Sequence, residues 1–360
     1  MSVTYPMNFF VFMIFILNIV VLSSSAAKHV NKNDLRDEDT LAYRETISDT
    51  FTDIYYIILD GYANDKTLSK DFDYAANPFT SLLKNKNFYV ADSSRGNYLV
   101  TSESLGSSLN YNYLDSTPKP LSIYKNLASK YLKQKGYRII HMNSGYSVTR
   151  ENYYADEKIV LQGPNEFERS LLRYSIFRLD DLVGYTHYSF LIEQLKRIYD
   201  VISIKGPKFT LLHIVSPHPP YVCDEKGAFH KATKIKNSWW EPRESYLIQL
   251  QYINKEIGNF IQELMRSGNK KKIIIVQSDH GPWIKDDSIQ TVYEARSRIL
   301  NAYYIPYSFR NKLYSSITPV NSFRIIFNGL FLDSLPMLPD VPMNADAMKK
   351  YSQTGAMLGD

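Results

Sequence analysis

The stretch that decides the fold is KKIIIVQSDHG, residues 271–281. Its four β-branched apolar residues, Ile273 to Val276, predict a strand buried on both faces, as strands of parallel sheets are. The run stops at Asp279-His280-Gly281, which places a carboxylate and an imidazole just beyond the carboxyl end of the strand. Ligands of open α/β sheets bind at that edge, so this pair is a candidate half of a metal site. Asp279 could instead cap the next turn, with His280 packed nearby, and this stretch alone does not decide between the two.

A second stretch of the same design is IYYIILDG, residues 54–61. It is another apolar run, and it ends in a carboxylate, Asp60, followed by a glycine. Two strands far apart in the chain would therefore deliver Asp60 and the pair Asp279-His280 to one edge of a sheet. This coincidence favours chemistry at that edge over a simple turn.

Further apolar runs and helical spacings alternate along the chain. The sequence predicts strands at 88–91, 137–141 and 208–215 and helices at 78–84, 123–133, 190–201 and 245–265. Thr101 and Ser104 are typical of a helix start, with Leu105 and Leu109 at helical spacing behind them. Strands that alternate with helices predict an α/β fold, with a mostly parallel central β-sheet flanked by helices on both faces.

The composition is that of a globular protein with a full core. The 360 residues are 44% hydrophobic and 22% charged, and the net charge is +5. The densest basic cluster, Lys270 to Lys272, precedes a buried strand, and no basic stripe occurs, so nucleic-acid binding is not expected. A mildly positive surface could favour anionic lipids or phosphorylated substrates. The single cysteine, Cys223, excludes an intramolecular disulfide and lacks the spacing of a zinc or redox motif.

The two ends of the chain differ from its middle. Residues 1–27 carry no charged side chain, and the apolar run from Phe9 to Leu22 has the length of a signal-peptide core. No basic residue precedes that run, which leaves a single uncleaved membrane anchor as the alternative. Either way we expect export, to the periplasm or the extracellular side, or anchoring to the membrane by the N-terminal segment. The predicted organisation is completed by a polar linker at 28–52, a catalytic domain at 53–334 and a C-terminal tail at 335–360.

Polar groups end three of the predicted strands, at Asp60, His218 and the pair Asp279-His280. Thr101 opens a helix, where partial positive charge and free N–H groups gather. A threonine hydroxyl becomes a good nucleophile when a divalent cation binds its oxygen and stabilises the alkoxide. Asp60, Asp279 and His280 would hold that cation, with the threonine as the fourth ligand. Mixed oxygen and nitrogen ligands suit zinc or manganese better than calcium, and His218 could bind the anionic substrate or protonate its leaving group.

Five motifs occur in order along the chain: LDGY at 59–62, NYxxTxxSLxSSLN at 97–110, HIxSPHPPY at 213–221, SDHG at 278–281 and LNAYY at 300–304. As an ordered set, they resemble the sulfatase-like hydrolases and transferases of the alkaline phosphatase superfamily. The resemblance is to the bacterial membrane-associated branch, near lipoteichoic acid synthases and phosphoethanolamine transferases. It extends from about Asp53 to Asn328 and so covers most of the chain.

The resemblance implies one divalent metal ion held by Asp60, Thr101, Asp279 and His280. It also implies a covalent phospho-threonine intermediate at Thr101, with His218 at the substrate position. The substrate would be a phosphoryl ester, and a lipid-linked or cell-envelope compound is one option. Many relatives in this branch carry several N-terminal membrane helices, whereas at most one is present here. Membrane residence and a lipid-linked donor are therefore left open.

Two other functions are alternatives. The first is a sulfuric-ester hydrolase, but the true sulfatases mature a cysteine or serine within C/S-x-P-x-R, and that motif is missing around Cys223 and elsewhere. The second is a catalytically inactive binding protein that retains the fold, against which the intact set of four candidate ligands argues.

Several polar residues have simpler structural interpretations. Thr101 could be a plain N-cap. His213 lies within a predicted strand and is expected to be a hydrogen-bonded core residue. Arg296 and Arg324 could contact a phosphoryl group, but a surface or helix-packing role is the expectation for each.

Overall fold

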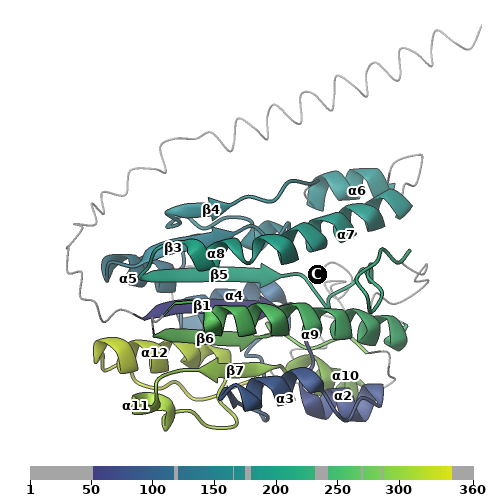
Figure 1. Ribbon diagram of the computed structural model, residues 1–360. Helices are drawn as coiled ribbons and strands as arrows, with labels where there is room; N and C mark the ends of the chain where they lie inside the picture. The colour runs from purple at the N-terminus through teal and green to yellow at the C-terminus, as the bar shows by residue number, and fades with distance from the viewer. Residues whose placement is uncertain are drawn as a thin grey trace, which may run out of the picture. The chain divides into compact units, whose positions relative to one another are not determined.

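The computed structural model describes residues 52–116, 121–164, 166–174, 180–231, 242–268, 271–284, 286 and 288–342. The predicted signal peptide or anchor at 1–27 lies outside these residues, as do nearly all of the predicted linker and residues 343–360 of the predicted tail. The described part is built on a seven-stranded sheet with the strand order β2-β7-β6-β1-β5-β3-β4, and helices lie against both of its faces (Figure 1).

The strands, in chain order, are β1 (Asp53–Leu59), β2 (Tyr89–Val90), β3 (Arg138–Met142), β4 (Glu157–Ile159), β5 (Lys208–Ile214), β6 (Lys272–Gln277) and β7 (Asn301–Tyr304). The α-helices are α2 (Asp65–Phe72), α3 (Pro78–Asn85), α4 (Thr101–Leu109), α5 (Leu127–Gln134), α6 (Glu166–Tyr174), α7 (Asp180–Arg197), α8 (Asp200–Ser203), α9 (Arg243–Arg266), α10 (Ile289–Ser297), α11 (Tyr307–Arg310) and α12 (Ser322–Phe331). Short 3-10 turns are η2 (Leu114–Ser116), η3 (Ser147–Thr149) and η4 (Pro319–Asn321).

Most of the sheet is parallel. Strand β1 pairs in parallel with β5 and β6, and β3 pairs in parallel with β4 and β5. Strand β7 runs the other way, antiparallel to both β6 and β2. The predicted α/β fold, a mostly parallel sheet flanked by helices, is therefore confirmed.

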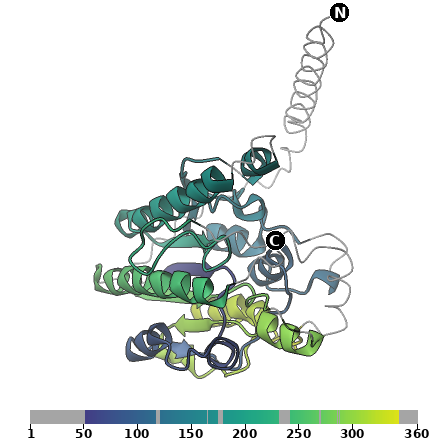
Figure 2. The same ribbon diagram turned by 90° about the vertical axis from the view of Figure 1, so that its right-hand side faces the viewer.

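Side chains of β1 alternate between two hydrophobic cores, one on each face of the sheet. The odd-numbered residues from Tyr55 to Leu59 pack with residues of α3, α7 and α9. The even-numbered residues from Ile54 to Ile58 pack with residues of α4, α5 and α12. Figure 2 shows α7 and α9 on one side of the sheet and α12 on the other. Full burial of each such aliphatic side chain contributes about 1.5–3 kcal/mol, which explains why this strand is a continuous apolar run.

Two predicted helices have different limits in the structure. The helix predicted at 123–133 begins at Leu127, because the Asn126 side chain accepts a hydrogen bond from Ser129 N at 2.8 Å and caps the helix there. The helix predicted at 190–201 is the second half of α7 followed by the separate turn α8. The first half of α7 contains Gly184 and several β-branched and aromatic residues, which have weak helix propensity, so only its packing in the fold makes it helical.

Candidate active site

The carboxyl ends of three neighbouring strands meet at the candidate site. Strands β6, β1 and β5 are adjacent and parallel. Asp60 follows β1 directly, His218 lies four residues after β5, and Asp279-His280 lies just after β6. The expectation that these strand ends share one edge of the sheet is thus met by the topology.

Hydrogen bonds hold the loops after β1 and β6 against each other. Asp279 Oδ1 accepts hydrogen bonds from Gly61 N at 3.1 Å and from His280 N at 2.9 Å. Gly61 has a φ of 72°, in the left-handed region that favours glycine. Gly281 lies so close to α10 that a Cβ atom there would be 2.1 Å from Ala295 O. The two glycines that follow the candidate ligands therefore have backbone reasons to be glycine.

Thr101 is the first residue of α4. The N-cap is Val100, which makes no side-chain capping bond, so Thr101 is not a plain N-cap. Its Oγ1 lies 3.2 Å from His280 Nε2. One turn further along α4, Ser104 Oγ donates to Asp279 O at 2.7 Å. The predicted helix start is confirmed, and its first side chain faces the strand ends.

The structure brings the four predicted ligands together. His280 Nε2 lies 3.2 Å from Asp279 Oδ2 and 3.6 Å from Asp60 Oδ1. One ligand atom from each of Asp60, Asp279 and His280 lies within 4.8 Å of the others. These three side chains and Thr101 are buried. The cluster has the size of the inner shell of one metal ion.

The electrostatics of this cluster suit a cation. Burial and, to a smaller extent, the neighbouring charge of Asp60 together raise the pKa of Asp279 to about 6. Burial lowers the pKa of His280 well below its usual range, so the imidazole is neutral and can ligate. Asp279 Oδ2 is buried and accepts no hydrogen bond from the described residues. Two adjacent buried carboxylates and a neutral imidazole form a donor set that fits a divalent metal.

His218 lies beside the cluster. Its backbone N–H donates to Asp60 O at 3.1 Å, and its Nδ1 lies 2.6 Å from Pro219 O. The centre of its ring is 6.4 Å from that of His280. Burial lowers the pKa of His218, and the charge of Asp60 offsets part of this effect. The side chain is therefore neutral near pH 7, with Nδ1–H directed at the proline carbonyl.

His213, which the sequence predicts to be a core residue only, also belongs to the site. As expected, it is buried and hydrogen-bonded, with Nδ1 at 2.7 Å from Thr149 Oγ1. Its Nε2, however, lies 3.2 Å from Asp60 Oδ2, so it also forms part of the site wall. Burial lowers its pKa to about 4. The available signal was its position, one residue before the end of a buried strand at the ligand-binding edge.

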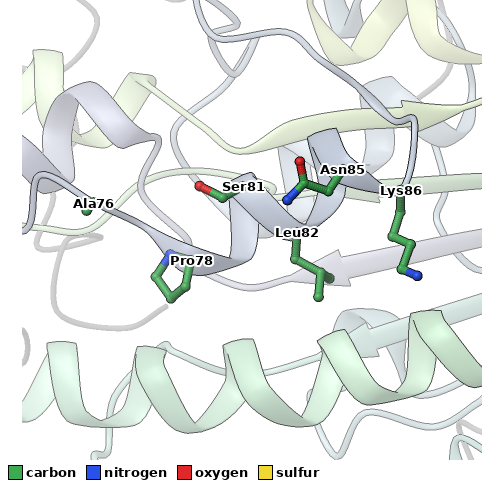
Figure 3. A pocket seen from close by; sticks show the side chains of 6 residues that line it. All are labelled: Ala76, Pro78, Ser81, Leu82, Asn85 and Lys86. Atoms are coloured by element: carbon green, nitrogen blue, oxygen red, sulfur yellow. The ribbon is translucent and has the colours of Figure 1, made fainter.

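Two hollows lie on the described surface outside the cluster. One, of about 160 Å³, lies at the carboxyl ends of β3 and β4 and includes His141, Arg150, Glu151 and Lys158 in its lining. The other is open and lies along α3, where Figure 3 shows Pro78 and Leu82 on the side of the helix that faces its neighbour, α9. None of the candidate ligands lines either hollow.

The two arginines differ from each other in position. Arg324 packs α12 against the end of α4, donating to Tyr111 O at 2.8 Å, as the helix-packing expectation has it. Arg296 is fully buried beside the site, which contradicts a surface role. The reason is its aromatic neighbour: the guanidinium lies 4.3 Å from the centre of the Trp283 ring.

Cys223 is buried, as expected of a small core residue. No helix among the described residues is both long and apolar enough to cross a bilayer.

Comparisons with known proteins agree with this fold. The sequence profile of the sulfatase family, described as "Sulfatase", matches residues 52–318. The solved C-terminal periplasmic domain of EcEptC from Escherichia coli in complex with Zn is 14% identical, with a TM-score of 0.56 over 78% of this chain and 83% of that one. Ps i-CgsB is 12% identical, with a TM-score of 0.51 over 80% of this chain and 73% of that one. At such identities the likeness concerns the fold alone. None of the curated proteins compared with the chain matches it.

Proposed function

Because the chain belongs to the sulfatase family, we propose that it is a metal-dependent enzyme that hydrolyses or transfers phosphoryl esters through Thr101. The observation that supports this most is the position of the Thr101 hydroxyl, 3.2 Å from Nε2 of His280 and at the first turn of a helix. The nucleophile, the candidate ligands and the positive end of α4 thus share one buried place, where a phosphoryl group would be attracted.

Asp60, Thr101, Asp279 and His280 would hold one divalent cation, with zinc or manganese as the candidates. The EcEptC domain, which has a similar fold, was crystallised with Zn. When bound, such an ion would stabilise the threonine alkoxide and polarise a phosphoryl oxygen. The hydrogen bonds from Gly61 N and His280 N fix the Asp279 carboxylate in place before any ligand arrives.

The reaction has two half-steps at Thr101. In the first, Oγ1 attacks phosphorus and the bond to the leaving alcohol breaks to give phospho-threonine, while the proton of the threonine hydroxyl passes through solvent to the departing oxygen. In the second, water or another alcohol attacks this phosphorus and releases Thr101. Neutral His218 can accept the proton of the incoming water or alcohol on Nε2, because Nδ1–H is directed at Pro219 O. The same histidine, once protonated, can return that proton to Oγ1 of Thr101, the oxygen that leaves phosphorus in this half-step.

The substrate is proposed to be anionic and to come from the cell envelope, with a lipid-linked compound as one option. The hollow at the ends of β3 and β4 supports an anionic group, because Arg150 and Lys158 in its lining outnumber Glu151. Thr149, which precedes the lining residue Arg150, contacts His213 of the site through its hydroxyl. The similar EcEptC domain is periplasmic, which supports export of this chain. Sulfate-ester hydrolysis is the second candidate, since the matching family is that of the sulfatases.

The proposal is tested by assaying the full-length chain, purified in detergent, with bis-p-nitrophenyl phosphate and p-nitrophenyl sulfate in the presence of Zn²⁺ or Mn²⁺. We expect turnover of the phosphodiester and a fall on the order of 10³-fold or more in kcat for Thr101→Ala. Ser102→Ala is the matched control, since Ser102 is the next residue of α4 and exposed. Sulfate turnover that survives Thr101→Ala would overturn the nucleophile assignment, and metal binding without turnover of any ester would favour an inactive binding protein.

A further inference from the structure

Arg296 is an unusual residue of the site region because its guanidinium is fully buried. It lies on α10, stacked on the ring of Trp283 at 4.3 Å from the ring centre. Its Nε donates to Leu99 O at 2.8 Å, and its Nη1 donates to Gly281 O at 3.0 Å. Burial of a charge is costly unless its donors are satisfied, so a fold that keeps this arginine inside has a use for its geometry.

The two carbonyl groups belong to the two loops that present the reacting groups. Leu99 lies two residues before Thr101, and Gly281 directly follows His280. The guanidinium therefore spans the gap between the nucleophile loop and the metal-ligand loop. A second hydrogen bond joins α10 to the nucleophile loop: Gly96 N donates to Ser297 O at 2.8 Å.

The contact at Gly281 also reaches the imidazole of His280. The same carbonyl oxygen lies 3.1 Å from His280 Nδ1. A proton on Nδ1 leaves the lone pair of Nε2 for the side where Thr101 and Asp279 lie. Partners that orient a ligating histidine in this way tune both its direction and its basicity. Arg296 therefore fixes the Gly281 carbonyl oxygen, which in turn orients the His280 imidazole through Nδ1.

We propose that Arg296 is a positioning residue that holds the Leu99 and Gly281 carbonyl groups and so keeps Thr101 and His280 in register for metal binding and attack. The inference rests on the proposed function of Thr101 and His280. It assigns the role to the planar fork of the guanidinium and to its stacking on Trp283, which a lysine ammonium cannot reproduce. The positive charge alone is therefore not sufficient, and Arg296→Lys separates the two contributions.

The chain contains a matched control for this substitution. Arg324 donates from Nε to Tyr111 O at 2.8 Å and from Nη1 to Pro336 O at 2.6 Å, and it lies over the Tyr111 ring. It has the same kind of neighbours as Arg296 but contacts neither the nucleophile loop nor the metal-ligand loop through these bonds. Arg324→Lys thus removes the hydrogen bonds of a guanidinium to two backbone carbonyl groups, as Arg296→Lys does, but at a place away from the site.

The test compares the full-length wild type, Arg296→Lys and Arg324→Lys in detergent. Zn²⁺ affinity is measured by competition with a chromophoric chelator, and kcat and KM are measured for bis-p-nitrophenyl phosphate. For Arg296→Lys we expect a loss of roughly 10- to 100-fold in Zn²⁺ affinity and about 100-fold in kcat at saturating Zn²⁺, with KM unchanged. Arg324→Lys should lower the melting temperature only. Equal Zn²⁺ affinity and equal kcat in Arg296→Lys and the wild type would overturn the proposal.

Amide hydrogen exchange separates a failure of this proposal from a failure of the proposed function. If the wild type neither binds Zn²⁺ nor turns over an ester, the proposed function is wrong, and the exchange data then decide on Arg296 alone. The proposal requires faster exchange in Arg296→Lys at the peptides around Leu99 and Gly281, with the rest of the chain unchanged. Unchanged exchange there, or faster exchange everywhere, refutes it. If Arg296→Lys does not fold, Trp283→Leu removes the stacking surface and must produce the same local pattern, or the proposal fails.

Discussion

The stability of the protein should fall in mild acid because several histidines are buried, and the contribution of His141 to this fall can be isolated. His141 lies on β3, is 2% exposed and lines the hollow beside the site. Burial lowers its pKa from 6.5 to about 4, and the backbone of Arg150 and Thr149, which raises it, offsets only part of that effect. Between pH 6.5 and about pH 4, His141 is therefore protonated in the unfolded state but remains neutral in the folded state.

The sign and size of the effect follow from these two pKa values. Above pH 6.5 the imidazole is neutral in both states, and it contributes no pH dependence. Below pH 6.5 the unfolded state takes up a proton while the folded state does not, so the free energy of unfolding decreases until the folded-state pKa near 4 is reached. Each pKa unit corresponds to about 1.4 kcal/mol, which gives a loss of about 2 kcal/mol at pH 5 and about 3 kcal/mol at pH 4.

The assay is urea unfolding of the full-length chain in detergent at pH 7.5 and pH 5, for the wild type and His141→Phe. The quantity compared is the difference between the two free energies of unfolding within each protein, because the packing change caused by phenylalanine is then the same at both pH values. The wild type should lose about 2 kcal/mol more than the variant. Ile139→Val, a buried change on the same strand, should leave the wild-type difference intact. An equal loss in His141→Phe and the wild type would show that the reasoning is wrong.

Three shorter predictions concern other parts of the chain. Zn²⁺ at 100 times its Kd should stabilise the wild type by about 2.7 kcal/mol, and the same concentration should leave the melting temperature of Asp60→Asn unchanged. Cys223 is 2% exposed and burial raises its pKa to about 12, so a thiol reagent should label it only after unfolding. Asp340 accepts hydrogen bonds from Thr318 N at 2.9 Å and Thr318 Oγ1 at 2.7 Å; Asp340→Ala should cost about 1–3 kcal/mol in urea unfolding and speed proteolysis near residue 340.

The strands that carry the site could be predicted because burial on both faces leaves an unbroken apolar run. Strands β1, β5 and β6 are all of this kind, and their limits lie within one residue of the prediction. Strand β4 could not be predicted in this way, because Glu157–Ile159 is three residues long and two of the three are charged. It is a strand only because β3 offers it hydrogen-bonding partners from residues earlier in the chain. Pairing of that kind leaves no periodic pattern in the sequence.

The same distinction applies to the site. Asp60 and Asp279 could be predicted because each ends an apolar run, so that the sheet topology alone brings them together. Arg296 could not, since a helix of mixed composition gives no indication that one of its arginines is buried against loops around residues 99 and 281. Its position depends on Trp283 and on two backbone carbonyl groups. Contacts to main-chain atoms leave no trace in the identity of the residues that provide them.

The charge balance of the site finally predicts the kind of ester that it turns over best. The charged groups that act on the pKa values of the site histidines are Asp60, Asp279 and Arg296. When the imidazoles are neutral, the two carboxylates and the guanidinium give the site a net charge of −1. A bound divalent cation would change this net charge to +1. A phosphodiester monoanion would neutralise that positive charge, whereas a phosphomonoester dianion would leave one excess negative charge buried in the site. The cost of desolvating an ion grows with the square of its charge, but its attraction to the site grows only linearly.

We therefore expect kcat/KM for bis-p-nitrophenyl phosphate to exceed that for p-nitrophenyl phosphate by at least about tenfold at pH 7.5, a difference of about 1.4 kcal/mol. The two compounds share a leaving group, so the comparison reports on the charge of the ester. Arg296→Gln removes one positive charge and should strengthen the preference for the diester, because the site then loses the attraction that offsets part of the larger desolvation cost of the dianion. A monoester turned over as fast as the diester by the wild type would mean that further cationic groups face the substrate, and the charge balance drawn from these three residues would be wrong.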